Sequence, residues 1–346
     1  MSMKRLLVIV AMAAFLGGGV VLSQTAGPAA ANADGLVVGS GNYFSPIVRD
    51  LDTAMAFYRD GLGLEIQGPP GDAAANPALR DMFGLPDARI RWAIARTPAA
   101  AGGVEIVEIS NAGGRRLDRK LQDPGANCLV VTVRDLDGTL GRLRKSGAPV
   151  VTIGGEPVTI GQGTRIVIVR DPDGNFVELS QPAEPPSSAP PNTNVIGVRV
   201  RLAVPDAVAA ARLYQNDLGL QERAPIGEYG NNDAVLRALG LTGGRYRVAQ
   251  QTVPGSGLMY DFVDFAGTER RTVPGRIQDF GSTRVQLRVR NLEAAIAAFK
   301  RSGGEVVSAG GRPVALPAGN STQRVAIVRD PSNLFVVLIE APPAAR

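Results

Sequence analysis

An internal repeat constrains this chain more than any other feature of its sequence. Residues 48–64 recur as residues 204–220, an offset of 156 positions, and both copies contain a central Tyr and end in Leu-Gly-Leu. Self-similarity over this length indicates one structural unit that occurs twice. The Pro-rich residues 181–193 separate the copies and are typical of a semi-rigid linker. We therefore predict two tandem domains, residues 36–180 and 194–341.

Each predicted domain is itself doubled. Residues 130–147 and 286–303 repeat the order found from Phe44 onward: an alternating strand, an Asp or Asn cap, a short amphipathic helix and a glycine. Short strand-like runs and an Asp-Pro turn follow each later helix, with the turns at 171–175 and 330–334. The pattern predicts an α+β fold of four βαβββ modules, two in each domain.

The N-terminus has the features of a targeting signal. Lys4 and Arg5 precede an apolar run over 6–22, and Ala31-Asn32-Ala33 supplies small residues for cleavage. This order predicts a signal peptide over 1–33 and an exported protein, periplasmic or extracellular. An uncleaved leader that anchors the chain in a membrane is the alternative. The only cysteine, Cys128, excludes an internal disulfide and lipidation at a leader cysteine.

Composition excludes several classes of function. The 37 Lys and Arg against 32 Asp and Glu form no basic stripe interleaved with aromatic residues, which argues against a nucleic-acid partner. The chain contains no histidine, so catalytic sites that require imidazole, such as Ser-His-Asp and Cys-His, are impossible. We expect a small-molecule partner, and no membrane contact once the leader is removed.

Several motifs together resemble those of the vicinal oxygen chelate superfamily, the group of glyoxalases, bleomycin-resistance proteins and extradiol dioxygenases. The motifs are Val48-Arg-Asp-Leu-Asp, Phe57-Tyr58, Leu62-Gly63-Leu64 and residues 171–179. The resemblance implies that the two modules of each domain form one curled mixed sheet with a ligand on its concave side. It also implies a monomer, because tandem domains complete within one chain the dimer that single-domain relatives build from two. The superfamily hosts many chemistries, so the reaction is not implied.

Many members of that superfamily hold a divalent metal on two histidines and one or two carboxylates. The resemblance places these ligand positions, strand by strand, at Tyr43 and Arg199, Glu108 and Asp264, Cys128 and Arg284, and Glu178 and Val337. A guanidinium repels a divalent cation and does not deprotonate to become a ligand. We therefore expect no metal site and no other cofactor.

The retained carboxylates suggest one kind of chemistry. Placed by the resemblance on the concave face of one sheet, Glu108 and Glu178 would share a poorly solvated cup, where one pKa rises and suits a general acid or base. Such a pair would serve a metal-free isomerase or lyase. The alternative is that both are relics of the ligand set, solvated or paired with a neighbour such as Arg91.

The two arginines suggest binding. Arg199 and Arg284 would converge in the second cup, where guanidinium groups recognise an anionic small molecule. The alternative is an internal salt-bridge network with Asp264, because a buried cation needs a partner. Tyr43 and Trp92 would contribute an aromatic wall or core packing, and Cys128 is expected to be an inert small hydrophobic residue.

These observations favour an exported, metal-independent protein that binds a small molecule, with an anion as the candidate ligand. Two alternatives stay open: a metal-free isomerase or lyase that uses Glu108 and Glu178, and a structural protein that has lost catalysis. Unpaired acids in a deep cup would favour the enzyme, and converging arginines in an open cup would favour binding. Cups filled by the protein's own side chains would favour the structural alternative.

Overall fold

The computed structural model describes residues 35–72, 76–318 and 321–342. The predicted leader over 1–33 lies outside this range. The fold is α+β with two curled mixed sheets, as predicted. Within the described ranges, no helix has the length and hydropathy needed to cross a membrane.

The first sheet has eleven strands, ordered β16-β18-β19-β15-β2-β6-β5-β3 with three further strands paired at its sides. Its strands are β1 (Val37–Ser40), β2 (Ser45–Val48), β3 (Glu65–Ile66), β4 (Gly71–Asp72), β5 (Arg89–Arg96), β6 (Val104–Ser110), β15 (Thr283–Val289), β16 (Glu305–Val306), β17 (Val314–Ala318), β18 (Ser321–Arg329) and β19 (Phe335–Glu340).

The second sheet has eight strands in the order β12-β13-β14-β11-β7-β10-β9-β8. Its strands are β7 (Asn127–Val133), β8 (Val158–Ile160), β9 (Thr164–Arg170), β10 (Phe176–Gln181), β11 (Val195–Ala203), β12 (Gln221–Glu222), β13 (Arg245–Thr252) and β14 (Met259–Ala266).

The modules pair differently from the expectation. Numbered along the chain, the four modules span residues 37–110, 127–181, 195–266 and 283–340. The first sheet joins modules 1 and 4 through β2 and β15, and the second joins modules 2 and 3 through β7 and β11. The prediction that each sequence domain closes its own sheet was therefore wrong. The domain boundaries themselves stay a prediction.

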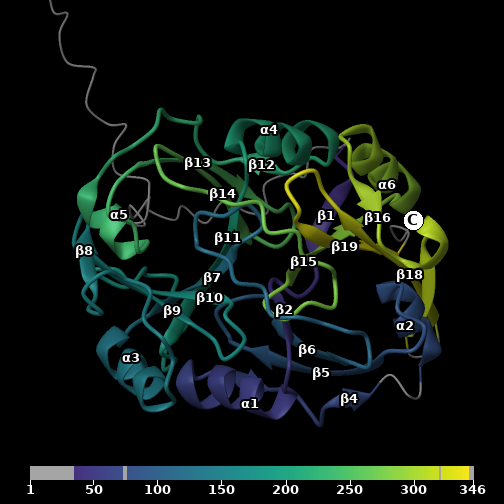
Figure 1. Ribbon diagram of the computed structural model, residues 1–346, viewed down its shortest axis with the longest axis horizontal. Helices are drawn as coiled ribbons and strands as arrows, with labels where there is room; N and C mark the ends of the chain where they lie inside the picture. Colours follow the sequence, from purple (N-terminus) through teal and green to yellow (C-terminus); the bar gives the residue numbers. More distant parts are fainter. Residues whose placement is uncertain (1–34, 73–75, 319–320, 343–346) are drawn as a thin grey trace, which may run out of the picture.

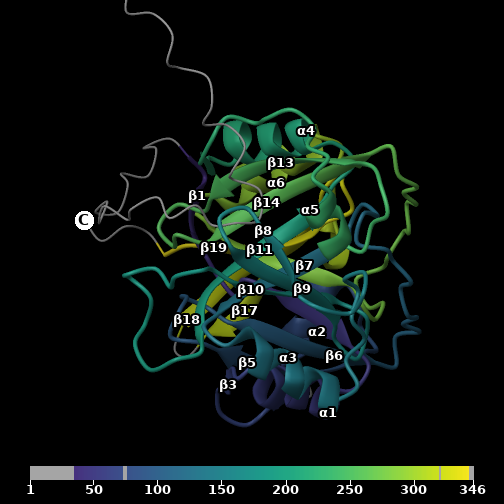
Figure 2. The same ribbon diagram turned by 90° about the vertical axis from the view of Figure 1, so that its left-hand side faces the viewer.

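Helices hold together the modules that the sheets separate. η1 (Phe57–Gly61), which continues α1 (Leu51–Ala56), packs on α3 (Leu136–Lys145), and η3 (Leu213–Asp217), which continues α4 (Ala207–Arg212), packs on α6 (Leu292–Arg301). In Figure 1 α1 and α3 lie side by side at the bottom, and Figure 2 shows α4 at the opposite end with the sheets between. Contacts between helices thus join the two modules of each sequence repeat, whereas each sheet combines one module from each repeat.

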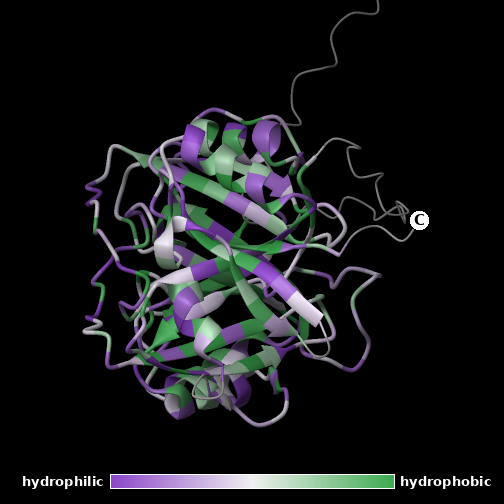
Figure 3. Cartoon of the chain, turned by 90° about the vertical axis from the view of Figure 1, so that its right-hand side faces the viewer, coloured by the Kyte–Doolittle hydropathy of each residue, from purple (hydrophilic) through white to green (hydrophobic). Residues whose placement is uncertain are grey.

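The helices begin where the sequence predicted them. Asp50, Asp135, Asp206 and Asn291 each cap a helix by accepting hydrogen bonds from backbone N–H groups of its first turn. The apolar faces of these helices pack on the convex faces of both sheets and form the largest hydrophobic cluster. Figure 3 shows hydrophilic residues on the outer helices and alternating hydrophobic and hydrophilic residues along the strands.

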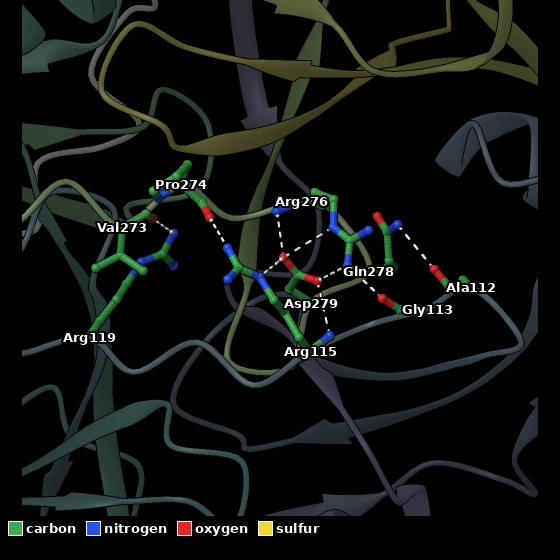
Figure 4. A network of polar contacts seen from close by, with 9 residues as sticks. All are labelled: Ala112, Gly113, Arg115, Arg119, Val273, Pro274, Arg276, Gln278 and Asp279. Carbon is green, nitrogen blue, oxygen red and sulfur yellow. Dashed lines mark hydrogen bonds and ion pairs between the residues drawn. The ribbon is translucent and has the colours of Figure 1, made fainter.

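A crossover clasp, which we define as residues 115–123 and 269–280, lies between the two sheets. These segments connect module 1 to module 2 and module 3 to module 4. Asp279 accepts hydrogen bonds from the backbone N–H groups of Arg115 and Arg276, and Asp123 accepts them from Lys120 and Arg271. Figure 4 shows the Asp279 half. Asp123 and Asp279 are 156 residues apart and are therefore equivalent positions of the two repeats. The clasp thus joins equivalent segments of both repeats to each other, where the chain crosses from one sheet to the other.

Two buried tyrosine–aspartate pairs join the helices to the Asp-Pro turns. The Tyr58 hydroxyl donates to Asp171, and the Tyr214 hydroxyl donates to Asp330, both over 3.1 Å. The Asp330 carboxylate also accepts the backbone N–H groups of Ser332 and Leu334. The Asp-Pro turn of the sequence is therefore a connection between modules 1 and 2, and again between modules 3 and 4.

The second of these pairs makes stability depend on pH. Burial raises the pKa of Asp330 to about 6 from an ordinary value of 3.8. Between those values the folded chain binds more protons at this carboxyl than the unfolded chain, so its stabilising contribution falls as pH rises. We expect Asp330→Asn to abolish the part of this fall that Asp330 causes, about 2 kcal/mol of unfolding free energy between about pH 4 and pH 7. Urea denaturation at both pH values measures this, and a profile parallel to that of the wild type would contradict it.

Candidate binding site in the concave faces

The concave face of each sheet forms a cup, which we call cup 1 for the first sheet and cup 2 for the second. Apolar side chains of the protein fill much of both. α2 (Pro77–Phe83) contributes Met82 and Phe83 to the cluster in cup 1, and α5 (Asp233–Ala238) contributes Val235 and Leu236 to the cluster in cup 2. These helices lie in the segments that connect η1 to β5 and η3 to β13.

Four charged side chains occupy the centre of cup 2. Glu178 accepts a hydrogen bond of 2.7 Å from Arg201, and both side chains are almost fully buried, at 0% and 3% exposure. Arg199 lies 3.0 Å from Asp261 and 3.7 Å from Glu178. The Arg199–Asp261 contact is ionic, without hydrogen-bond geometry. Two guanidinium groups and two carboxylates therefore neutralise one another.

Burial and charge set the titration of this centre. Burial opposes the charge of Arg201, but Glu178, Cys128 and Asp261 together outweigh burial and hold the pKa of Arg201 above its ordinary value. Cys128 faces Arg201 across the β7–β11 joint, and burial raises the pKa of its thiol to about 12. The thiol stays protonated at neutral pH, in agreement with the prediction of an inert residue.

Cup 1 has a smaller polar centre. The Arg284 guanidinium lies 3.2 Å from Glu105 and 4.7 Å from the centroid of the Phe83 ring. Glu105 also accepts hydrogen bonds from Gln286 and Ser45. Arg284 is fully buried, and neither its Nε nor its Nη1 donates a hydrogen bond within the described residues. Burial lowers the pKa of Arg284, partly offset by Glu105.

The two cups share one rule at the joint between modules. Arg201 stands opposite Cys128 in cup 2, and Arg284 stands opposite Ser45 in cup 1. Each joint thus places one guanidinium opposite one small side chain, and a nearby carboxylate compensates the positive charge. Arg199 and Arg284 lie in different sheets. The expectation that they converge on one ligand was therefore wrong.

Glu108 and Asp264 lie outside both cups, which corrects their predicted placement. Glu108 accepts the N–H of Leu51 at the start of α1, and Asp264 accepts the N–H of Ala207 at the start of α4, both over 2.9 Å. Arg91 pairs with Glu108 over 3.3 Å, as the alternative proposed, and Arg247 pairs with Asp264 over 2.6 Å. The physical reason is that the first N–H groups of a helix have no partner in the helix and need an acceptor.

Glu108 and Glu178 therefore do not share a cup. Glu108 belongs to β6 of the first sheet and faces the helices, whereas Glu178 belongs to β10 of the second sheet and faces inward. The predicted acid–base pair of two neighbouring carboxylates is absent at these positions. Glu178 alone lies on the concave face, and a guanidinium already occupies it.

The aromatic candidates serve packing. Tyr43 is fully buried in the hydrophobic cluster under the helices, away from the cup opening, and burial raises the pKa of its hydroxyl. Trp92 packs against the cluster in cup 1. A Cβ at Gly71 would lie 2.2 Å from its ring, so glycine lets β4 pass over Trp92.

The sequence analysis missed Glu105, Arg201, Asp261 and Gln286. Strand alternation contained the signal, because Glu105 shares its face of β6 with Val107 and Ile109, which point into cup 1. The repeat contained a second signal, since Glu105 and Asp261 are 156 residues apart, as are Glu108 and Asp264. Glu108 and Asp264 accept hydrogen bonds at the starts of α1 and α4, so Glu105 and Asp261 are the carboxylates of the two cups.

These donors do not suit a divalent metal. The inward positions of cup 2 offer two carboxylates already paired with guanidinium groups and a thiol that stays protonated. Cup 1 offers one carboxylate beside a guanidinium. Across the described ranges, no group of three or more His, Cys, Asp or Glu side chains is arranged to hold a metal ion.

Two cavities open away from these centres. One of about 380 Å³ lies at the mouth of cup 2, and one of about 460 Å³ lies between α2 and the start of β17. Neither lining includes Glu178, Arg201 or Arg284. The centres are thus polar cores beneath the surface, and the mouth of cup 2 offers space of the size that small-molecule sites use.

Comparison with known proteins agrees with this fold. Residues 42–179 match the family described as Glyoxalase/Bleomycin resistance protein/Dioxygenase superfamily. Glyoxalase I from Zea mays aligns with a TM-score of 0.55 and 17% identity over 87% of this chain and 92% of that one. A putative dioxygenase from Bacillus subtilis subsp. subtilis str. 168 aligns with a TM-score of 0.53 and 15% identity over 89% and 87%. No curated protein matches the sequence.

At such identities the aligned structures show the fold alone, and a fold does not specify a function. The family match covers the first repeat, and the structural matches extend over both. Residues 42–179 therefore belong to the glyoxalase/bleomycin resistance/dioxygenase superfamily.

Proposed function

We propose that this protein is an exported, metal-independent binding protein for a small, anionic molecule. One observation carries the proposal: the Arg201 guanidinium lies in the centre of cup 2, 2.7 Å from Glu178. A fixed internal cation there supplies the positive charge that a bound metal ion would otherwise bring to the carboxylates. With every charge at this centre partnered inside the protein, neither an acid nor a base is left free for catalysis.

Ligand binding is tested on the purified full-length chain by native mass spectrometry and thermal shift. We expect a co-purified small molecule, or a melting-temperature increase with carboxylate ligands, that EDTA leaves unchanged. A ligand that stabilises the folded state raises its stability in proportion to the logarithm of its concentration. Loss of binding after EDTA would contradict metal independence. A chain that binds nothing from a broad panel would favour the structural alternative, which the filled cups also support.

Export and oligomeric state complete the proposal. The basic and apolar order of residues 1–33 supports cleavage and release. Cell fractionation with N-terminal sequencing of the mature chain tests it, and an intact N-terminus in the membrane fraction would favour the anchored alternative. We propose a monomer, because modules 1 and 4 and modules 2 and 3 already join within one chain.

A further inference from the structure

The cavity at the mouth of cup 2 is built differently from the paired centre beneath it. The apolar part of its lining includes Leu121, Leu239 and Leu241, which belong to the cluster that fills cup 2. The polar side chains of its lining are Lys120, Gln122, Arg170, Thr242, Thr268 and Glu269. The cavity thus joins an apolar floor to a rim that carries two positive charges and one negative charge.

Arg170 is the fixed cation of this cavity. Its guanidinium donates to the backbone carbonyls of Arg119 and Gly174, over 2.7 and 3.2 Å, and lies 4.3 Å from the centroid of the Phe176 ring. Within the described ranges no carboxylate forms an ion pair with it, unlike Arg199, Arg201 and Arg284. Burial lowers the pKa of Arg170, but a guanidinium remains charged at neutral pH. Carbonyls and a ring orient this cation, while Asp118, Asp171 and Asp123 attract it from beyond ion-pair distance.

Lys120 is the second cation, and it is loosely held. Its ammonium lies 3.0 Å from Glu269, and both side chains are about half or more exposed, at 47% and 69%. Ion pairs at such exposure contribute little to stability, so Lys120 can turn toward another anion. Gln122 is fixed by donating to the backbone carbonyl of Glu269.

From these contacts we propose that the mouth cavity binds a monocarboxylic acid with a compact aromatic or branched aliphatic body. Its carboxylate contacts Arg170 and Lys120, and its body lies on Leu121, Leu239 and Leu241. The net charge of +1 on the rim matches a monoanion. This inference rests on the proposed binding function and adds the position of the site and the class of ligand.

The test titrates 3-phenylpropanoate and 3-methylbutanoate, with 3-phenylpropanamide as the uncharged control, into the full-length chain by calorimetry. We expect at least one carboxylate to bind, and the amide at least about tenfold more weakly than the matching acid, because the charge-assisted hydrogen bonds are lost. Arg170→Gln and Lys120→Met should each weaken carboxylate binding. Arg312→Gln, at the other cavity, is the matched control and should leave binding unchanged.

Circular dichroism verifies that each variant folds, and Lys120→Met, which alters an exposed side chain, keeps the test valid if Arg170→Gln does not fold. Equal binding of acid and amide would overturn the inference, and so would the absence of binding by either carboxylate. Carboxylate binding that neither rim variant weakens would overturn the site while leaving the proposed function in place. A co-purified ligand detected by mass spectrometry separates failure of this inference from failure of that function.

Discussion

Arg201→Met is expected to lower the free energy of unfolding by about 3–5 kcal/mol, the range measured when one partner of a buried ion pair is removed. Glu178 is fully buried, and after the substitution its nearest cation is Arg199 at 3.7 Å. A carboxylate without its main partner must either remain charged in an apolar surrounding or take up a proton. Urea denaturation of the variant and the wild type at neutral pH measures the loss.

A double variant separates the ion pair from simple packing. Glu178→Leu with Arg201→Met removes both charges, and we expect most of the loss to be recovered, because apolar residues of similar volume often replace a buried pair without penalty. Arg165→Met breaks the exposed pair with Asp137 and is the matched control, with an expected change below about 1 kcal/mol. If Arg201→Met behaved like Arg165→Met, the charge of Arg201 would not compensate Glu178.

Asp279→Ala is expected to destabilise the chain by about 3 kcal/mol or more, since it removes several hydrogen bonds to one buried carboxylate. The Asp279 side chain has 0% exposure and accepts the backbone N–H groups of Arg115 and Arg276 together with the Arg276 guanidinium. Without it, two backbone donors of the crossover clasp lose their acceptor. Denaturant midpoints of the purified variant measure the effect.

The crossover clasp supplies its own controls. Asp123→Ala, at the position equivalent under the repeat, should have a similar effect because Asp123 accepts the N–H groups of Lys120 and Arg271. Asp118→Ala alters an exposed carboxylate in the same segment and should change stability by less than about 0.5 kcal/mol. Equal effects of Asp118→Ala and Asp279→Ala would show that the clasp does not connect the crossovers.

Local features of the fold were predictable because they depend on near neighbours in the sequence. The caps at Asp50, Asp135 and Asn291 and the Asp-Pro turns at 171–175 and 330–334 follow from residue type and spacing. The repeat predicted four modules for the same reason. Which modules share a sheet was not predictable from these patterns, because the strands of modules 1 and 4 are more than 150 residues apart and either pairing satisfies the same strand alternation.

The site was predictable in its chemistry and less so in its geometry. Side-chain identity at Glu178, Arg199 and Arg284 placed charges on concave faces, where the structure has them. The placement of Glu108 in a cup was wrong because the start of α1 competes with the cup for a carboxylate of β6. Partners from different modules of one sheet, such as Arg201 for Glu178, require knowledge of the crossed pairing of modules.

In both cups, guanidinium groups lie beside the carboxylates that a divalent metal would need as ligands. The most direct measurement is the metal content of the full-length chain, expressed in medium supplemented with zinc, nickel, manganese and iron, by inductively coupled plasma mass spectrometry. We predict a content well below one ion per chain. One tightly held ion in either cup would show that these carboxylates bind a metal despite the adjacent guanidinium groups.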